Sequence, residues 1–122
     1  MKKIGIISDV HLPYEHTIAL NKALTILKQE QPDIVVVNGD LLDFPGLSRY
    51  AQVPDFTKTT LKEELVLGWS FFSDLRQICP KSRIVFTEGN HEFRLRSYTL
   101  RLAPKMYDYI DMRRDFELDK RS

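Results

Sequence analysis

Residues 34–40 read Ile-Val-Val-Val-Asn-Gly-Asp, and this stretch decides the fold. Its four β-branched residues in a row are typical of a strand that is buried on both faces of a parallel sheet. A similar apolar run at 4–8 predicts another strand upstream. Between the two, the apolar residues of 17–28 repeat with helical spacing, with Thr17 as the expected N-cap and Pro32 closing the segment. Strand, helix and strand in this order predict a right-handed βαβ unit.

The alternation of strand and helix continues downstream. Residues 41–59 contain proline and glycine and have no regular period, which predicts a long loop. Thr60 and Glu63 form a capping box that starts a second helix, and Pro80 ends that helix. A third strand is expected at 84–87. The apolar stripe of the second helix, which we expect in the core, consists of Leu65, Trp69, Phe72, Leu75 and Ile78.

The whole pattern indicates a single α/β domain over residues 1–122. A helix is expected after the third strand, up to Ala103, and the charged C-terminal segment 105–122 shows no clear pattern. We therefore expect a βαβ-based, mostly parallel sheet with flanking helices. Three strands with two or three helices would leave one face or edge of the sheet uncovered, which favours self-association or a complementing chain.

The composition is that of a globular protein and excludes several classes of function. The 122 residues are 43% apolar and 29% charged, and the net charge of +1 does not indicate a nucleic-acid or membrane binder. The first apolar run meets Asp9 too early for a signal peptide or a membrane-spanning helix. Cys79 is the single cysteine, so it cannot form an intramolecular disulfide, and we expect it in the core of a cytoplasmic protein.

Polar side chains of metal-binding types follow each predicted strand. Because the carboxyl ends of parallel strands meet at one edge of a sheet, we expect these side chains to converge there. On an extended backbone Asp9 and His11 would point to the same side, and Gly39 permits a close backbone approach. Mixed oxygen and imidazole donors suit Mn²⁺, Fe or Zn²⁺. The three clusters are Asp9-Val10-His11, Gly39-Asp40-Leu41-Leu42-Asp43 and Gly89-Asn90-His91-Glu92.

The motifs D-x-H, G-D-x-x-D and G-N-H-E, each after a strand and in this order, resemble the calcineurin-like metallophosphoesterase family. The match covers roughly residues 1–104. Within the family, the Leu-Leu-Asp after Gly-Asp and the continuation Phe93-Arg94-Leu95-Arg96 are most similar to proteins encoded by tailed bacteriophages. The resemblance implies that the chain forms the first, N-terminal half of the α/β sandwich of this family.

The resemblance also implies two divalent metal ions and the hydrolysis of phosphate esters. Family members hydrolyse phosphomono- or phosphodiesters with metal-activated water and form no phosphoenzyme, so a phosphodiesterase is expected. His91 is implied to contact the phosphate and to donate a proton to the leaving group, and Asp43 to orient His91. The implied metal ligands are Asp9 and His11 for the first ion, Asp40 for both ions, and Asn90 for the second.

The chain departs from the family pattern after His91. The resemblance implies further metal-binding histidines, including a final G-H-x-H, but no histidine follows position 91. The second ion would keep only Asp40 and Asn90, and we expect it to bind weakly. Two alternatives to an active enzyme follow. The chain is an incomplete half that acts as an assembly or interaction module, or a separate polypeptide supplies the missing histidines.

Several of these residues also have structural interpretations. Arg94 and Arg96 can bind the phosphates of a nucleotide or nucleic-acid substrate, or they can belong to a solvated helix face. His16 is expected in a solvated loop, and Asp43 can cap the loop that follows it. Glu92 can sit at a helix start because the helix dipole favours an acid there. A nucleotide-binding domain without metals is disfavoured, because no glycine-rich phosphate loop follows the first strand.

Overall fold

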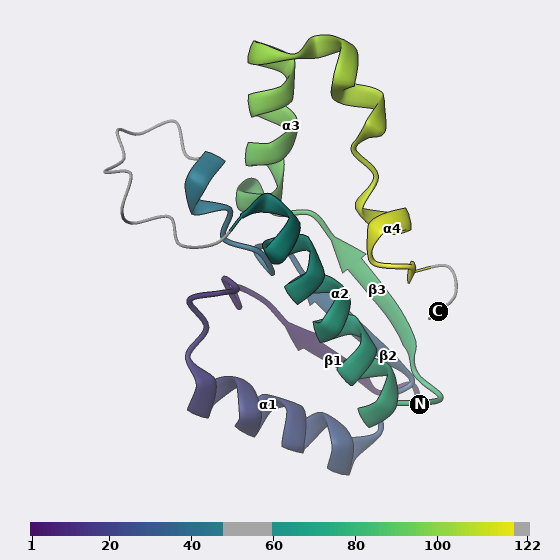
Figure 1. The fold of residues 1–122 in the computed structure, drawn as a ribbon. Coiled ribbons are helices and arrows are strands. Elements are labelled where there is room, and N and C mark those ends of the chain that lie inside the picture. The colour runs from purple at the N-terminus through teal and green to yellow at the C-terminus, as the bar shows by residue number, and fades with distance from the viewer. Residues whose placement is uncertain (48–59, 119–122) are drawn as a thin grey trace.

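The computed structural model describes residues 1–47 and 60–118 as a parallel sheet with helices packed against it (Figure 1). The strand order is β1-β2-β3, and both strand pairs are parallel, which confirms the predicted α/β fold. Most of the expected loop at 41–59 lies outside the described residues. The elements in chain order are β1 (Ile4–Ile7), α1 (Thr17–Glu30), β2 (Ile34–Asn38), η1 (Pro45–Leu47), α2 (Leu61–Ile78), β3 (Arg83–Thr87), α3 (Asn90–Leu102), η3 (Pro104–Tyr109) and α4 (Met112–Asp115).

The two faces of the sheet differ in burial. Val35 and Val37 of the central strand β2 are fully buried, as expected for a strand inside a parallel sheet. Helices α1 and α2 cover this face (Figure 1), since α1 packs on Gly5 and α2 packs its rings on β3. On the other face Ile4 and Ile6 are 56% and 67% exposed. The described part of the chain therefore leaves apolar sheet surface uncovered, as the count of elements predicts.

Helix α1 is capped by a histidine. The predicted N-cap, Thr17, is wrong, because Thr17 is the first helical residue and His16 is the N-cap. Nδ1 of His16 accepts the backbone N–H of Ala19 at 3.2 Å, in the way that a serine or aspartate oxygen does. His16 is exposed, as expected, and it also has this capping role. The helix ends where Gln31 adopts a left-handed φ of +41°.

Helix α2 begins with the predicted capping box. Thr60 Oγ1 accepts the N–H of Glu63 at 3.1 Å, and the Glu63 carboxylate accepts the N–H of Thr60 at 3.3 Å. One prediction for this helix is wrong, because Trp69 is 40% exposed and not in the core. The buried face is centred one position earlier, on Gly68, where the ring of Phe116 packs so closely that a side chain would overlap it.

The charged C-terminal segment, which shows no pattern in the sequence, contributes to the core as far as residue 118. Met112 and Phe116 are 2% and 0% exposed. The ring of Phe116 lies 5.4 Å from that of Phe72 and 5.8 Å from that of Phe86, so it joins α4 to both α2 and β3. Aromatic rings at such distances attract each other beyond their burial. Cys79 is also fully buried, as expected.

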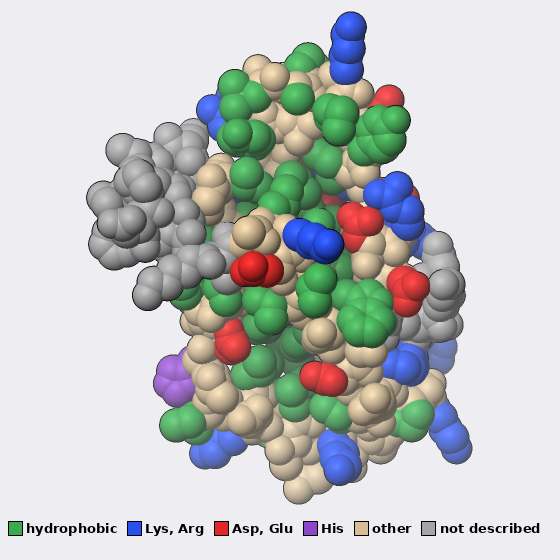
Figure 2. All heavy atoms as spheres, viewed as in Figure 1, with side chains coloured by type: hydrophobic (Ala, Val, Ile, Leu, Met, Phe, Trp, Pro, Cys, Tyr) green, Lys and Arg blue, Asp and Glu red, His purple; other side chains and the backbone are tan. Residues whose placement is uncertain are grey.

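Helix α3 projects beyond the sheet together with η3 (Figure 1). Figure 2 shows apolar side chains at the surface of this projecting part. Leu102, Met106 and Tyr109 are 64%, 53% and 68% exposed there. The base of α3, in contrast, starts against the carboxyl edge of the sheet, where Leu95 is buried. This helix therefore has a buried end near the predicted site and an apolar, solvent-exposed end.

Candidate metal centre

Two glycines allow the loops after β2 and β3 to touch. Gly39 has a φ of +76° and Asp40 a φ of +51°, so the chain turns sharply as it leaves β2. A Cβ on Gly39 would lie 3.0 Å from Gly89 Cα, and a Cβ on Gly89 would overlap the Asp40 carboxylate. Only residues without a side chain fit this contact. The close backbone approach expected at Gly39 is present, and its partner is Gly89.

Two carboxylates cross between the same loops. Asp40 Oδ1 accepts the backbone N–H of His91 at 2.9 Å. Glu92 Oε1 accepts the backbone N–H of Leu41 at 3.2 Å and that of Gly89 at 3.3 Å. Burial raises the pKa of Glu92 to about 6, and these backbone donors act in the opposite direction. The sequence indicates only a helix-start acid at Glu92, whereas the bond to Leu41 fastens the two loops together.

The loop after β1 lies beside the loop after β2. The N–H groups of Asp9 and His11 donate to the carbonyls of Gly39 and Asp40 at 3.2 and 2.9 Å. Asp9 and His11 have φ angles of +57° and +55°, so the expected extended backbone is wrong here. Hydrogen bonds to the neighbouring loop hold this conformation. The two side chains still approach each other, with His11 Nε2 3.7 Å from Asp9 Oδ1.

His11, Asp40 and His91 form the tightest group of potential metal ligands in the described residues, with one ligand atom of each within 4.8 Å of the others. All three residues are partly buried, and the two imidazole rings meet edge to face with centroids 4.5 Å apart. Two ring nitrogens and a carboxylate oxygen suit Mn²⁺, Fe or Zn²⁺. Asp9 lies outside this group, and its side chain is 64% exposed.

The amide of Asn90 faces the carboxylate of Asp40. One terminal atom of the amide lies 3.2 and 2.9 Å from the two Asp40 oxygens. With nitrogen at that position, Asn90 donates hydrogen bonds to both oxygens. With oxygen at that position, the amide oxygen and the two Asp40 oxygens would repel one another unless a cation lay between them. A half-turn of the amide exchanges the two states, and the role of Asn90 as a metal ligand stays a prediction.

Asp43 lies between the two histidines of this group. Its Oδ1 is 3.0 Å from His11 Nδ1 and 3.3 Å from His91 Nδ1. Its main-chain carbonyl oxygen is 2.8 Å from His91 Nδ1. Because a carbonyl oxygen only accepts, Nδ1 of His91 is the donor in this arrangement. The structure thus brings Asp43 to His91, and it also brings Asp43 to His11, which the sequence does not indicate.

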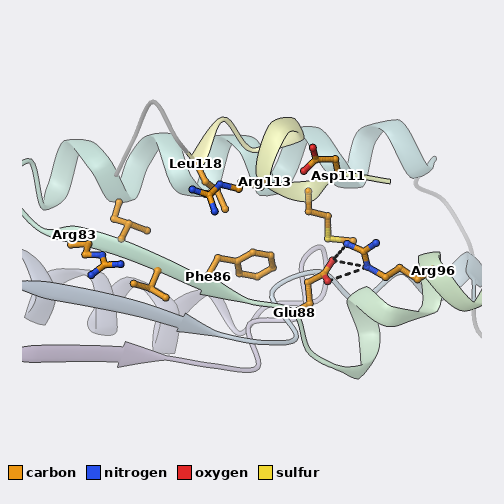
Figure 3. A pocket seen from close by; sticks show the side chains of 10 residues that line it. Arg83, Phe86, Glu88, Arg96, Asp111, Arg113 and Leu118 are labelled. Carbon is orange, nitrogen blue, oxygen red and sulfur yellow. Dashed lines mark hydrogen bonds and ion pairs between the residues drawn. The ribbon is translucent and has the colours of Figure 1, made fainter. Parts of the chain in front are cut away.

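Arg94 and Arg96, the predicted substrate-binding residues, both have partners within the protein. Arg94 Nη1 donates to the main-chain carbonyl of Asp43 at 3.0 Å. Arg96 donates from Nε and Nη2 to the Glu88 carboxylate, at 3.0 to 3.2 Å. Arg96 and Glu88 line a pocket of about 410 Å³ along β3 and α4, to which no predicted metal ligand contributes (Figure 3). A contact of either guanidinium with substrate stays a prediction.

Over residues 2–120 the sequence matches the calcineurin-like phosphoesterases. The chain belongs to this family. Membership confirms the resemblance seen in the three motifs, and it accounts for ligand-type side chains after three neighbouring parallel strands. Calcineurin-like phosphoesterases use divalent metal ions, so the family gives a chemical meaning to the group of His11, Asp40 and His91.

Two curated proteins are similar to this calcineurin-like chain. The Gene 54 protein of Mycobacterium phage L5 is 30% identical over 111 residues, and that of Mycobacterium phage D29 is 30% identical over 112 residues. These regions cover 89% and 90% of this chain but 43% and 44% of the relatives, so the chain spans less than half of their length. Both relatives support the predicted likeness to phage-encoded members.

No solved structure matches the chain. The described helices include none that is long and apolar enough to cross a membrane.

Proposed function

We propose that this protein is a metal-dependent phosphodiesterase. The observation that carries the proposal is the convergence of His11, Asp40 and His91, from three separate loops, in a chain of the calcineurin-like phosphoesterase family. The imidazole of His11 and the carboxylate of Asp40 suit a divalent transition metal, and His91 lies beside them, where it can act on a bound substrate. The chemistry of the family is the hydrolysis of phosphate esters. The proposed substrate is a phosphodiester of a nucleotide or a nucleic acid.

The proposal includes two divalent metal ions, Mn²⁺, Fe or Zn²⁺. When bound, the ions would activate a water molecule for attack on phosphorus and would neutralise charge on the phosphate. The second ion would have only Asp40 and Asn90 as predicted ligands, so we expect it to bind more weakly than the first. The residues that would hold the ions are Asp9 and His11 for the first, Asp40 for both, and Asn90 for the second.

His91 and Asp43 handle the proton of the leaving group in this proposal. Nδ1 of His91 donates to the Asp43 carbonyl at 2.8 Å, which orients the ring and leaves Nε2 to exchange a proton with the substrate. As general acid, His91 gives that proton to the leaving-group oxygen. The carboxylate of Asp43, 3.3 Å from Nδ1, stabilises the protonated ring. Loss of a general acid typically lowers the rate by about 10²- to 10⁴-fold.

Hydrolysis of the dinucleotide thymidylyl-(3′→5′)-thymidine with added Mn²⁺ tests the proposal, because its alkoxide leaving group needs a proton. We expect His91→Ala to lower the rate by about 10²-fold or more, because the variant lacks the proposed proton donor. The control is His16→Asn, which removes a histidine outside the site and keeps an acceptor for the α1 N-cap, so its rate should equal that of the wild type. Equal rates for wild type and His91→Ala reject the role of His91. Full activity in the presence of a chelator rejects the proposal that hydrolysis depends on a metal ion.

A second candidate function rests on the uncovered surface. Ile4 and Ile6 are exposed on the free sheet face, and Leu102, Met106 and Tyr109 are exposed on the projecting end of α3 and η3. Because exposed apolar patches mark interaction sites, we infer that a second copy or a separate polypeptide covers this surface, and a separate polypeptide would also supply further histidine ligands. Without added histidine ligands, the chain would be catalytically incomplete and would act as an assembly or interaction module.

Native mass spectrometry in the presence of Mn²⁺ distinguishes the two functions. An assembly that holds two metal ions tightly per chain supports the enzyme and contradicts the incomplete half. A monomer that holds one ion loosely supports the incomplete half. Ile6→Lys is the informative variant, because a charge on the free sheet face should disrupt an assembly that uses this face and leave metal binding by the monomer unchanged.

The cytoplasm is the proposed location. Cys79 is the single cysteine of the sequence, and its side chain is fully buried. A chain that needs no disulfide and keeps its thiol reduced suits a reducing compartment.

A further inference from the structure

The main-chain carbonyl of Asp43 accepts two donors from helix α3. His91 Nδ1 lies 2.8 Å from this oxygen and Arg94 Nη1 lies 3.0 Å from it. The two donor residues are three positions apart and therefore share one face of the helix. A carbonyl oxygen has two lone pairs, so both donors can bind it at the same time. The histidine and the arginine are thus linked through one atom of Asp43.

Arg94 also approaches the second oxygen of the Asp43 carboxylate. Its Nη1 lies 4.0 Å from Oδ2, while Oδ1 lies beside His11 and His91. The side chains of Arg94 and Asp43 are 24% and 18% exposed, so solvent only partly screens their attraction. A guanidinium has five N–H donors in a fixed planar arrangement, so Arg94 can bind the carbonyl and face the carboxylate at the same time.

We propose that Arg94 is a positioning residue that acts through Asp43 and not by contact with the substrate. It holds the Asp43 carbonyl where this oxygen accepts the proton on His91 Nδ1, which fixes the tautomer and the orientation of the ring. Nε2 of His91 then remains the nitrogen that is available to a substrate. The effect of this arrangement on hydrolysis rests on the proposed function. The tautomer and the orientation of the His91 ring can be measured whether or not that function is correct.

Arg96 provides a matched control on the same helix. Its side chain is 22% exposed, compared with 24% for Arg94, and it is hydrogen-bonded to the carboxylate of Glu88. Methionine at either position removes the guanidinium and keeps most of the apolar length. The loss of a charge or of helix packing would therefore appear in both variants. The loss of the hydrogen bond to the Asp43 carbonyl would appear in Arg94→Met alone.

The ring of His91 reports the proposed contact directly. Long-range ¹H–¹⁵N spectra of metal-free, ¹⁵N-histidine-labelled protein at about pH 8, where an ordinary imidazole is neutral, distinguish the Nδ1–H from the Nε2–H form. We expect wild type and Arg96→Met to show mainly Nδ1–H. Arg94→Met should at least double the Nε2–H population, and Arg94→Lys, with one charged donor, should fall between. A spectrum of Arg94→Met equal to that of the wild type overturns the proposal.

The same spectra of the wild-type protein alone also test the proposal, so the test does not depend on whether a variant folds. A wild-type protein in which His91 carries its proton mainly on Nε2 lacks the bond to the Asp43 carbonyl, and this also overturns the proposal.

Steady-state kinetics separate positioning from substrate binding. Positioning predicts that Arg94→Met lowers kcat about tenfold with KM within about twofold of the wild type. A raised KM with unchanged kcat would make Arg94 a substrate-binding residue and would overturn the proposal. A wild type that hydrolyses no phosphodiester rejects the proposed function, and the measurement on the His91 ring still decides the role of Arg94.

Discussion

Helices α2 and α3 begin in different ways. The cap of α2 is local, because Thr60 and Glu63 satisfy each other within the first turn. Helix α3 begins after Gly89, which has no side chain to cap the helix. Glu92 in its first turn accepts the N–H of Gly89 and also that of Leu41, 51 residues away in the chain. The first arrangement stabilises a helix, and the second fastens a helix to the loop after β2, at the candidate metal centre. A helix start that belongs to a site thus takes its partners from other parts of the fold.

Each of these helices also buries a glutamate near its start, and the surroundings differ. Glu92 has two backbone donors, and burial raises its pKa to about 6. Glu64 is 3% exposed, and burial raises its pKa to about 7, which the backbone of Phe44 opposes and the charge of Asp43 reinforces. The extra donor of Glu92 accounts for its smaller shift. Backbone donors therefore stabilise the charged carboxylate of Glu92, at the start of α3, more than that of Glu64, at the start of α2.

The largest effect is expected at the start of α3, from Gly89→Ala. The added Cβ would overlap the Asp40 carboxylate and push the two loops apart. We expect the free energy of unfolding to fall by about 3 kcal/mol, measured by urea denaturation. Calorimetric titration with Mn²⁺ should show affinity weakened by about tenfold or more, as when groups that orient metal ligands are lost. Unchanged Mn²⁺ affinity would show that metal binding does not depend on the close contact between Gly39 and Gly89.

A smaller effect of opposite sign is expected at the start of α2, from Glu64→Gln. Below about pH 4.5 Glu64 is protonated in both the folded and the unfolded chain. As the pH rises from there to about 7, only the unfolded chain readily ionises, so the unfolding free energy of the wild type falls. The amide of the variant does not titrate, and we expect Glu64→Gln to be more stable by roughly 2 kcal/mol at about pH 8. Urea denaturation at several pH values measures this.

The matched control for that experiment is Glu63→Gln, in the exposed capping box of the same helix turn. Its unfolding free energy should show no comparable gain at high pH. An equal gain in both variants would assign the effect to the helix charge and not to burial at Glu64.

The smallest effect is expected from Thr60→Ala. The variant loses the acceptor for the N–H of Glu63, which costs about 1 kcal/mol in comparable caps. Urea denaturation should show this loss, and calorimetric titration should give the wild-type affinity for Mn²⁺. A weakened affinity would contradict the view that the start of α2 is local and independent of the site.

Local patterns were sufficient to predict much of the fold. β-branched runs mark β1 and β2, and the capping box marks α2, because the forces that specify these elements act between near neighbours in the chain. The convergence of Asp40 and His91 also follows from the sequence, since parallel strands bring their carboxyl ends together. The ordered set of motifs also predicts the family, and the match over residues 2–120 shows that this prediction is correct.

Features that depend on distant partners could not be predicted. The left-handed φ angles of Asp9 and His11 depend on hydrogen bonds to the loop after β2. Phe116 is buried because Gly68 leaves room for its ring, and a helix as short as α4 has too few turns to show an apolar period. The partner of Arg94 lies on another loop, so its sequence context allows a substrate contact and a protein contact equally.

The bond from the His91 amide to Asp40 joins residues that are 51 positions apart, and it has a consequence for synthesis. When a ribosome has released the chain only as far as Asp40, the carboxylate has no opposing loop. The binding of a cation between the loops must wait until the segment beginning at Gly89 has left the exit tunnel. A cation held between these loops, as proposed, would therefore be taken up only after β3 has been synthesised.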